Sequence, residues 1–126
     1  MTRNMAKILL VDDNALVLQS VKGLLTGNKN YSVVCAVNGE EAQKLLETED
    51  FDLMITDIRM GPVDGMQLIV STRASKPELP IVIASALTSD KVVEQAARLG
   101  VVGYIKKPFK MAEMIDVVER ALEGGK

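Results

Sequence analysis

The sequence predicts an α/β fold in which a doubly wound, five-stranded parallel sheet is covered by helices on both faces. Short apolar runs, typical of strands buried on both faces, alternate five times with segments whose apolar residues recur at helical spacing. The 126 residues suit one domain, and the 48% hydrophobic fraction is enough for a core. Regular alternation of strand and helix predicts parallel strands joined by helical crossovers.

The first two strand–helix units are marked by apolar runs and by glycine and asparagine at the helix ends. Residues 8–11 are four apolar residues in succession, as expected for a buried strand. Apolar residues then recur at helical spacing, and Gly27 is placed to end that helix. Residues 32–36 form the second predicted strand. Asn38 and Glu41 have the spacing of a capping box at the start of the second helix.

The remaining three units repeat the pattern. Residues 51–56, 81–84 and 101–105 are predicted strands. Helices are expected to begin near Asp64, to end at Gly100 and to follow the fifth strand. Five such strands favour the order 2-1-3-4-5 with five helices, the flavodoxin-like arrangement. In these sheets a ligand site lies beyond the carboxyl ends of the strands, where the strand order reverses between strands 1 and 3.

Polar side chains follow four of the five predicted strands at their carboxyl ends. They are Asp12 and Asp13 after the first strand, Asp57 after the third, Ser85 after the fourth and Lys107 after the fifth. Three carboxylates at one edge would repel each other, and Mg²⁺ relieves such repulsion with the oxygen ligands it prefers. A hydroxyl and an ammonium suit a phosphoryl group, and a carboxylate can be the nucleophile that forms an aspartyl phosphate. The pattern therefore predicts a phosphoryl-transfer site.

Each of these residues also has a purely structural interpretation. The pair at 12 and 13 could cap a helix, the aspartate at 57 could start a turn, the serine could be a cap and the lysine could be solvated. Their joint position at the edge where such sheets bind ligands favours the functional interpretation.

The composition excludes several other classes of function. The chain has no histidine, which excludes Ser-His-Asp and Cys-His catalysis and leaves oxygen ligands for any metal. The net charge of −2 and the lack of tryptophan argue against direct nucleic-acid binding. The single cysteine, Cys35, lies in an apolar run and is expected to be a buried structural thiol. No apolar stretch approaches the roughly 18 residues of a membrane span, and no signal peptide is evident. We therefore expect a cytoplasmic protein without membrane contact.

Four motifs occur in order at the predicted strand ends. They are Leu10-Val11-Asp12-Asp13, Asp57-Ile58-Arg59-Met60, Ser85-Ala86 and Tyr104-Ile105-Lys106-Lys107-Pro108-Phe109. Together they resemble the receiver domains of response regulators, including the chemotaxis regulators. The resemblance covers essentially the whole chain, so we expect residues 1–126 to be one receiver domain.

The resemblance implies a phosphoacceptor and a metal site. In a receiver domain the counterpart of Asp57 accepts a phosphoryl group from a histidine kinase or phosphotransfer protein of a two-component phosphorelay. The counterparts of Asp12, Asp13 and Asp57, with the backbone carbonyl at Arg59, bind Mg²⁺, and that of Lys107 contacts the phosphoryl group. Such a domain assists its own phosphorylation and slow autodephosphorylation, and is not otherwise an enzyme.

The resemblance also implies a conformational switch. The counterparts of Ser85 and Tyr104 change position on phosphorylation, and an output domain or effector protein responds to the change. The Lys107–Pro108 bond is cis in the family. Arg59 and Leu87 stand where side chains flank the path of the attacking water, so we expect them to slow the loss of the phosphoryl group.

The chain departs from the family pattern at two places. Gly61 comes between Met60 and Pro62, where the family has proline directly, and residues 100–103 lack the acidic residues of regulators that dimerise through helix 4, strand 5 and helix 5. Three alternatives stand beside the receiver prediction: a receiver-like interaction module that is not phosphorylated, a phosphatase with an aspartyl nucleophile, and a flavin carrier. The first lacks support because every acid and the lysine are present. The second would need a cap domain, and the third a phosphate-binding loop after the first strand.

Overall fold

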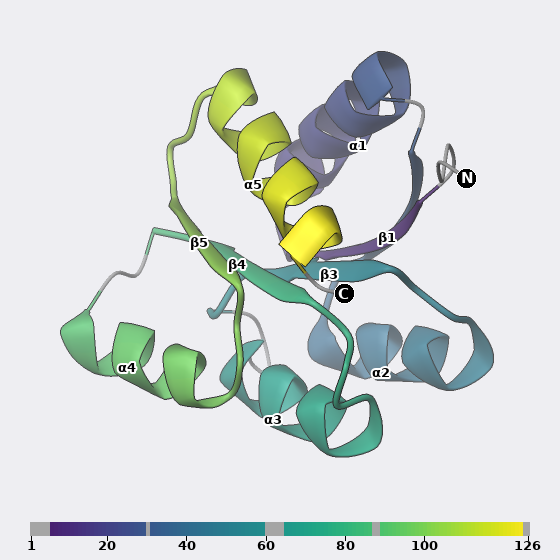
Figure 1. Ribbon diagram of the computed structural model, residues 1–126. Coiled ribbons are helices and arrows are strands. Elements are labelled where there is room, and N and C mark those ends of the chain that lie inside the picture. The colour runs from purple at the N-terminus through teal and green to yellow at the C-terminus, as the bar shows by residue number, and fades with distance from the viewer. Residues whose placement is uncertain (1–5, 30, 60–64, 87–88, 125–126) are drawn as a thin grey trace.

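The computed structural model describes residues 6–29, 31–59, 65–86 and 89–124. These residues form a five-stranded parallel sheet in the order β2-β1-β3-β4-β5, which confirms the predicted fold class. The strands are β1 (Lys7–Val11), β2 (Ser32–Ala36), β3 (Leu53–Thr56), β4 (Ile81–Ser85) and β5 (Gly103–Lys106). The helices are α1 (Ala15–Lys29), α2 (Gly39–Thr48), α3 (Gly65–Ser75), α4 (Asp90–Arg98) and α5 (Met111–Gly124). Helices α1 and α5 cover one face of the sheet, and α2, α3 and α4 cover the other (Figure 1).

Two layers of apolar side chains, one on each face of the sheet, form the core. Alternate residues of β1 point to opposite faces. Ile8 and Leu10 pack in the layer beneath α1 and α5, whereas Leu9 and Val11 pack in the layer beneath α2, α3 and α4. Burial of each such side chain contributes about 1.5–3 kcal/mol. The sheet is therefore held from both sides and provides a rigid base for the residues at its edge.

The register of the strands brings their carboxyl ends to one edge. Val11 pairs with Thr56 across β1 and β3, and Ser85 pairs with Lys106 across β4 and β5. The residues that follow these strands consequently leave the sheet side by side.

Two predicted helix ends are confirmed. Asn38 is the N-cap of α2: its side chain accepts from the Glu41 N–H at 2.8 Å, and the Glu41 carboxylate accepts from the Val37 N–H at 3.1 Å. Helix α4 ends at Arg98, and Gly100 follows with φ of 76°, the left-handed conformation that glycine adopts without strain.

The predicted end of α1 at Gly27 is wrong, because the helix continues to Lys29. A glycine within a helix costs only about 1 kcal/mol relative to alanine, which a helix packed along one face can tolerate.

Two strands begin later than predicted. Strand β3 begins at Leu53 rather than at residue 51, and β5 begins at Gly103 rather than at 101. In the second case the Val101 N–H donates to the Ala96 carbonyl at 3.1 Å, so residue 101 closes α4 before the chain enters the sheet. The expectations on Asp64, Leu87 and residues 60–62 lie outside the described residues. No described helix is long and apolar enough to cross a membrane.

Arg73, near the end of α3, ties two helix ends together. Its guanidinium donates to five backbone carbonyls within 3.4 Å, namely those of Lys76, Pro77, Leu79, Leu99 and Gly100. The first three belong to the turn between α3 and β4, and the last two to the turn between α4 and β5. One side chain thus holds the C-terminal end of α4 against the C-terminal end of α3.

Candidate functional site

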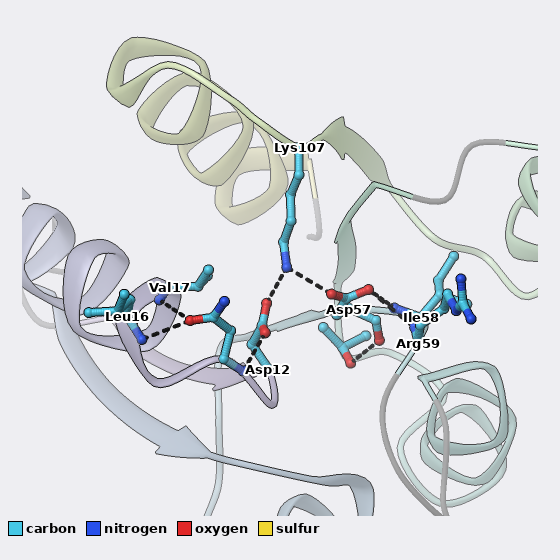
Figure 2. Close-up of polar contacts among 9 residues, drawn as sticks. Asp12, Leu16, Val17, Asp57, Ile58, Arg59 and Lys107 are labelled. Carbon is cyan, nitrogen blue, oxygen red and sulfur yellow. Dashed lines mark hydrogen bonds and ion pairs between the residues drawn. The ribbon is translucent and has the colours of Figure 1, made fainter.

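Two carboxylates and one ammonium meet at the carboxyl edge of the sheet. Lys107 Nζ lies 2.5 Å from Asp12 Oδ2 and 2.7 Å from Asp57 Oδ2 (Figure 2). Asp12 is 2% exposed and Asp57 is 8% exposed. Charges this far from water need partners, and the ammonium provides one for both acids.

The backbone after β3 holds the second oxygen of Asp57. Oδ1 accepts from the Ile58 N–H at 2.6 Å and from the Arg59 N–H at 3.2 Å, as Figure 2 shows. The Asp57 N–H in turn donates to the Val11 carbonyl at 3.1 Å, which continues the β1–β3 pairing by one residue. The carboxylate is therefore restrained on one side by backbone donors and on the other by the lysine.

These contacts keep the acid and the base in their charged forms. Burial raises the pKa of Asp57, but hydrogen bonding from Lys107 and Ser85, the Lys107 charge and the Arg59 N–H together hold that pKa below its usual 3.8. Burial lowers the pKa of Lys107, whereas Asp12 and Asp57 raise it more, so the net pKa lies above its usual 10.5. At neutral pH the site holds an ionised carboxylate beside a cation.

Asp12 is oriented by the turn that leads into α1. Its Oδ1 accepts from the Asn14 N–H at 2.9 Å. The cap of α1 is Asn14, whose side chain accepts from the N–H groups of Leu16 at 2.9 Å and Val17 at 3.3 Å. The sequence analysis did not single out Asn14, although asparagine is a strong N-cap residue and directly precedes the helix. Because Asn14 caps α1, Asp12 does not, and its carboxylate faces Lys107.

Asp13 does not join this pair in the structure, since its side chain is exposed. Among the described residues, no three acidic, histidine or cysteine side chains lie close enough together to enclose a metal ion. The donor chemistry nevertheless suits Mg²⁺, because Asp12 and Asp57 offer carboxylate oxygens at an edge without histidine or thiolate. The set of metal ligands stays a prediction.

Ser85 lies on β4, which pairs with β3, and Tyr104 lies on β5, which pairs with β4. Ser85 ends β4, is 1% exposed and lowers the pKa of Asp57. Tyr104 is partly buried against the apolar layer beneath α2, α3 and α4. Burial raises the pKa of Tyr104, and so does the negative charge of Asp57. Both residues are therefore within electrostatic reach of the predicted phosphoacceptor.

A comparison with known protein families gives a match over most of the chain. The model of the response regulator receiver domain matches residues 8–119. The chain belongs to this family.

The receiver domain is similar to parts of two longer regulators and to nearly the whole of one solved chain. It is 35% identical to the transcriptional regulatory protein GlrR of Escherichia coli, over 98% of this chain and 28% of that protein. It is 34% identical to the probable C4-dicarboxylate response regulator DctR of Bacillus subtilis, over 95% of this chain and 54% of that protein. The structure of the chemotaxis protein CheY4 of Vibrio cholerae superposes with a TM-score of 0.88 at 28% identity, covering 93% of this chain and 98% of that one. The chain thus spans about a quarter to a half of the length of these two curated relatives.

Three further expectations from the sequence can be compared with the structure, and the first of them is confirmed. The Lys107–Pro108 bond is cis. Arg59 directly follows the turn at Asp57 and its side chain is exposed. Cys35 was expected to be buried but is only partly buried; it packs against the layer beneath α1 and α5. Burial raises its pKa, which favours the unreactive thiol form.

Two residues beside Asp57 were missed by the sequence analysis. Thr56 Oγ1 donates to the Asp57 carbonyl at 2.8 Å. Gly65, the first residue of α3, lies so close that a Cβ on it would be 1.9 Å from the same carbonyl oxygen. The glycine could have been suspected as a point of close backbone approach, whereas nothing local in the sequence distinguishes the threonine from an ordinary strand residue.

Proposed function

We propose that the chain is a phosphorylation-activated signalling switch in which Asp57 accepts a phosphoryl group from a histidine kinase or phosphotransfer protein. The contact of the Asp57 carboxylate with the Lys107 ammonium carries this proposal. An ionised carboxylate is the nucleophile, and the ammonium is a donor and counter-charge for phosphoryl oxygens. In the transfer, an Asp57 oxygen forms the new O–P bond as the P–N bond to the donor histidine breaks, and the released imidazole takes up a proton.

Mg²⁺ is the proposed cofactor, held by Asp12, Asp13, Asp57 and the backbone carbonyl of Arg59. Hard oxygen ligands at the edge of the sheet support this assignment. The bound ion would supply charge neutralisation at the phosphoryl oxygens. The chain's own contribution is positional: the backbone N–H groups of Ile58 and Arg59 restrain the carboxylate.

Ser85 and Tyr104 are the proposed switch residues. A phosphoryl group adds about two negative charges at Asp57. Ser85 and Asp57 already interact, and the Asp57 charge already bears on Tyr104, so both would respond to this change. The response is a population shift of the surface formed by α4, β5 and α5, which an output domain or effector protein would recognise. We propose that residues 1–126 act as one such unit, on Asp57 rather than on a separate substrate. The expected cytoplasmic location and slow autodephosphorylation stay predictions.

Intact-mass measurement after incubation with phosphoramidate and Mg²⁺ tests the phosphoacceptor. One phosphoryl adduct is expected in the parent, and none in Asp57→Asn. Asp50→Asn is the matched control, because Asp50 is an exposed aspartate that precedes β3, and it should be modified like the parent. An undiminished adduct in Asp57→Asn would refute the assignment. No adduct in the parent would favour the non-phosphorylated interaction module.

The NMR shifts with and without beryllofluoride, a mimic of the phosphoryl group, test the switch. We expect changes at Asp57, at Ser85 and Tyr104, and along α4. Changes that stay close to Asp57 would contradict the proposed route.

Titration of Mg²⁺ against thermal unfolding tests the metal site. Mg²⁺ should stabilise the parent, and Asp13→Ala should respond much more weakly.

A further inference from the structure

The peptide group between Asp57 and Ile58 is held by hydrogen bonds on both of its edges. Its carbonyl oxygen accepts from Thr56 Oγ1 at 2.8 Å. Its N–H donates to Asp57 Oδ1 at 2.6 Å. Because the peptide group is planar and stiff, a contact that orients the carbonyl also orients the N–H. The threonine hydroxyl is thereby linked through one rigid unit to the carboxylate of the phosphoacceptor.

This link lies in a closely packed place that excludes water. Thr56 ends β3 and is 0% exposed, and Ile58 is 5% exposed. In the next peptide group, the Ile58 carbonyl accepts from the Gly65 N–H at 2.8 Å. Hydrogen bonds shielded from water are stronger and more directional than exposed ones. The hydroxyl therefore has a fixed partner and little freedom to choose another.

We propose that Thr56 is a positioning residue for the phosphoacceptor: through the 57–58 peptide, its hydroxyl aims the N–H that holds Asp57 Oδ1. The inference rests on the proposed function and adds a residue to it. Lys107 contacts the carboxylate itself. Thr56 acts indirectly, by contacting the backbone peptide group whose N–H holds the carboxylate. Without the hydroxyl the peptide can tilt, the N–H contact lengthens, and the carboxylate spends less time in the orientation needed for attack.

The rate of phosphorylation by phosphoramidate with Mg²⁺ tests this role. Thr56→Val keeps the shape and removes the hydroxyl, and it should react roughly three- to tenfold more slowly, as expected for loss of one hydrogen bond. Thr56→Ser restores the hydroxyl and should react at close to the parent rate. Thr72→Val is the matched control, because Thr72 is 1% exposed and its hydroxyl has no hydrogen-bond partner in the described part of the chain. It should react like the parent.

The backbone amide signal of Ile58 provides a readout that a merely structural role would not move. The short bond to Oδ1 should place this proton at low field, and Thr56→Val should shift it upfield and speed its exchange with solvent. Thr72→Val should leave the signal in place. If the valine variant does not fold, Thr56→Ala against Thr56→Ser makes the same comparison.

The outcomes separate the two proposals. A parent that gains no phosphoryl group refutes the proposed function itself. A parent that reacts while Thr56→Val reacts equally fast refutes the role of Thr56 alone. Equal slowing in the valine and serine variants also refutes it, because packing rather than the hydroxyl would then be responsible.

Discussion

Replacing Lys107 with methionine should turn the buried carboxylates of Asp12 and Asp57 into a destabilising feature at neutral pH. The ammonium is 2.5 and 2.7 Å from the two acids, whose side chains are only 3% and 11% exposed. Methionine fills a similar volume without charge. Two carboxylates would then share one site with no cation between them.

The size of the effect follows from the burial of the pair. Removal of one partner from a fully buried ion pair costs about 3–5 kcal/mol. The site lies at the edge of the sheet and the lysine side chain is 18% exposed, so water offsets part of this, and we expect about 2–3 kcal/mol. Typical domains unfold at a cost of about 5–15 kcal/mol, so the variant should still fold. The urea midpoint should fall by about 1–2 M.

The dependence on pH distinguishes this explanation from simple loss of packing. In the parent the folded pKa of Asp57 is below its usual 3.8, so this stabilisation is present above about pH 4 and is lost as the pH falls through the folded pKa. The raised pKa of Lys107 stabilises the fold below its usual 10.5 and ceases to do so as the pH rises through the folded value. In the variant the pKa of one carboxylate should instead rise above its usual value. The penalty should then be largest at pH 7 and shrink as the pH falls to 5.

Urea unfolding at pH 7 and pH 5, with divalent cations removed, is the measurement. Lys106→Met is the matched control, because Lys106 is the neighbouring exposed lysine on β5 and its loss changes the net charge equally. It should unfold close to the parent midpoint at both pH values. The reasoning fails if the two variants lose equal stability, or if the deficit of Lys107→Met does not shrink at pH 5.

Three further substitutions test other parts of the structure. Arg73→Met removes the donors to five backbone carbonyls and should lower the free energy of unfolding in urea by about 2–4 kcal/mol. Arg73→Lys, which lacks the planar guanidinium, should recover only part of this loss. Parent-like stability of Arg73→Met would contradict the role of these hydrogen bonds. Gly65→Ala places a Cβ 1.9 Å from the Asp57 carbonyl oxygen, so it should cost at least about 2 kcal/mol and slow phosphorylation of Asp57; parent-like behaviour in both assays would show that α3 can move away freely. Arg59→Asn should speed loss of the phosphoryl group after removal of the donor, because a shorter side chain leaves the path of the attacking water open; unchanged or slower decay would show that Arg59 does not shield the bond.

The location of the site could be predicted from the sequence because a parallel sheet converts local order into spatial proximity. Asp57 and Lys107 are 50 residues apart, yet each directly follows a strand. Strand ends of this kind meet at one edge whatever the intervening sequence is. What could not be predicted is which carboxylate takes the lysine. Asp12 and Asp13 are equivalent as sequence, and only the turn into α1, capped by Asn14, buries the first and exposes the second.

The roles of side chains that bind backbone atoms could not be predicted from the sequence, for a related reason. Arg73 lies near the end of α3, where an arginine is usually solvated, and its carbonyl partners include Leu99 and Gly100, some 26 residues away. Thr56 looks like any β-branched residue in a strand, because its hydroxyl gains its role from the conformation of the next peptide. Motifs predict groups with a fixed position, such as a strand end. Contacts to backbone carbonyls depend on where the loops place those carbonyls. The residues that support a site are therefore found from the structure, even where the residues that form the site can be predicted from the sequence.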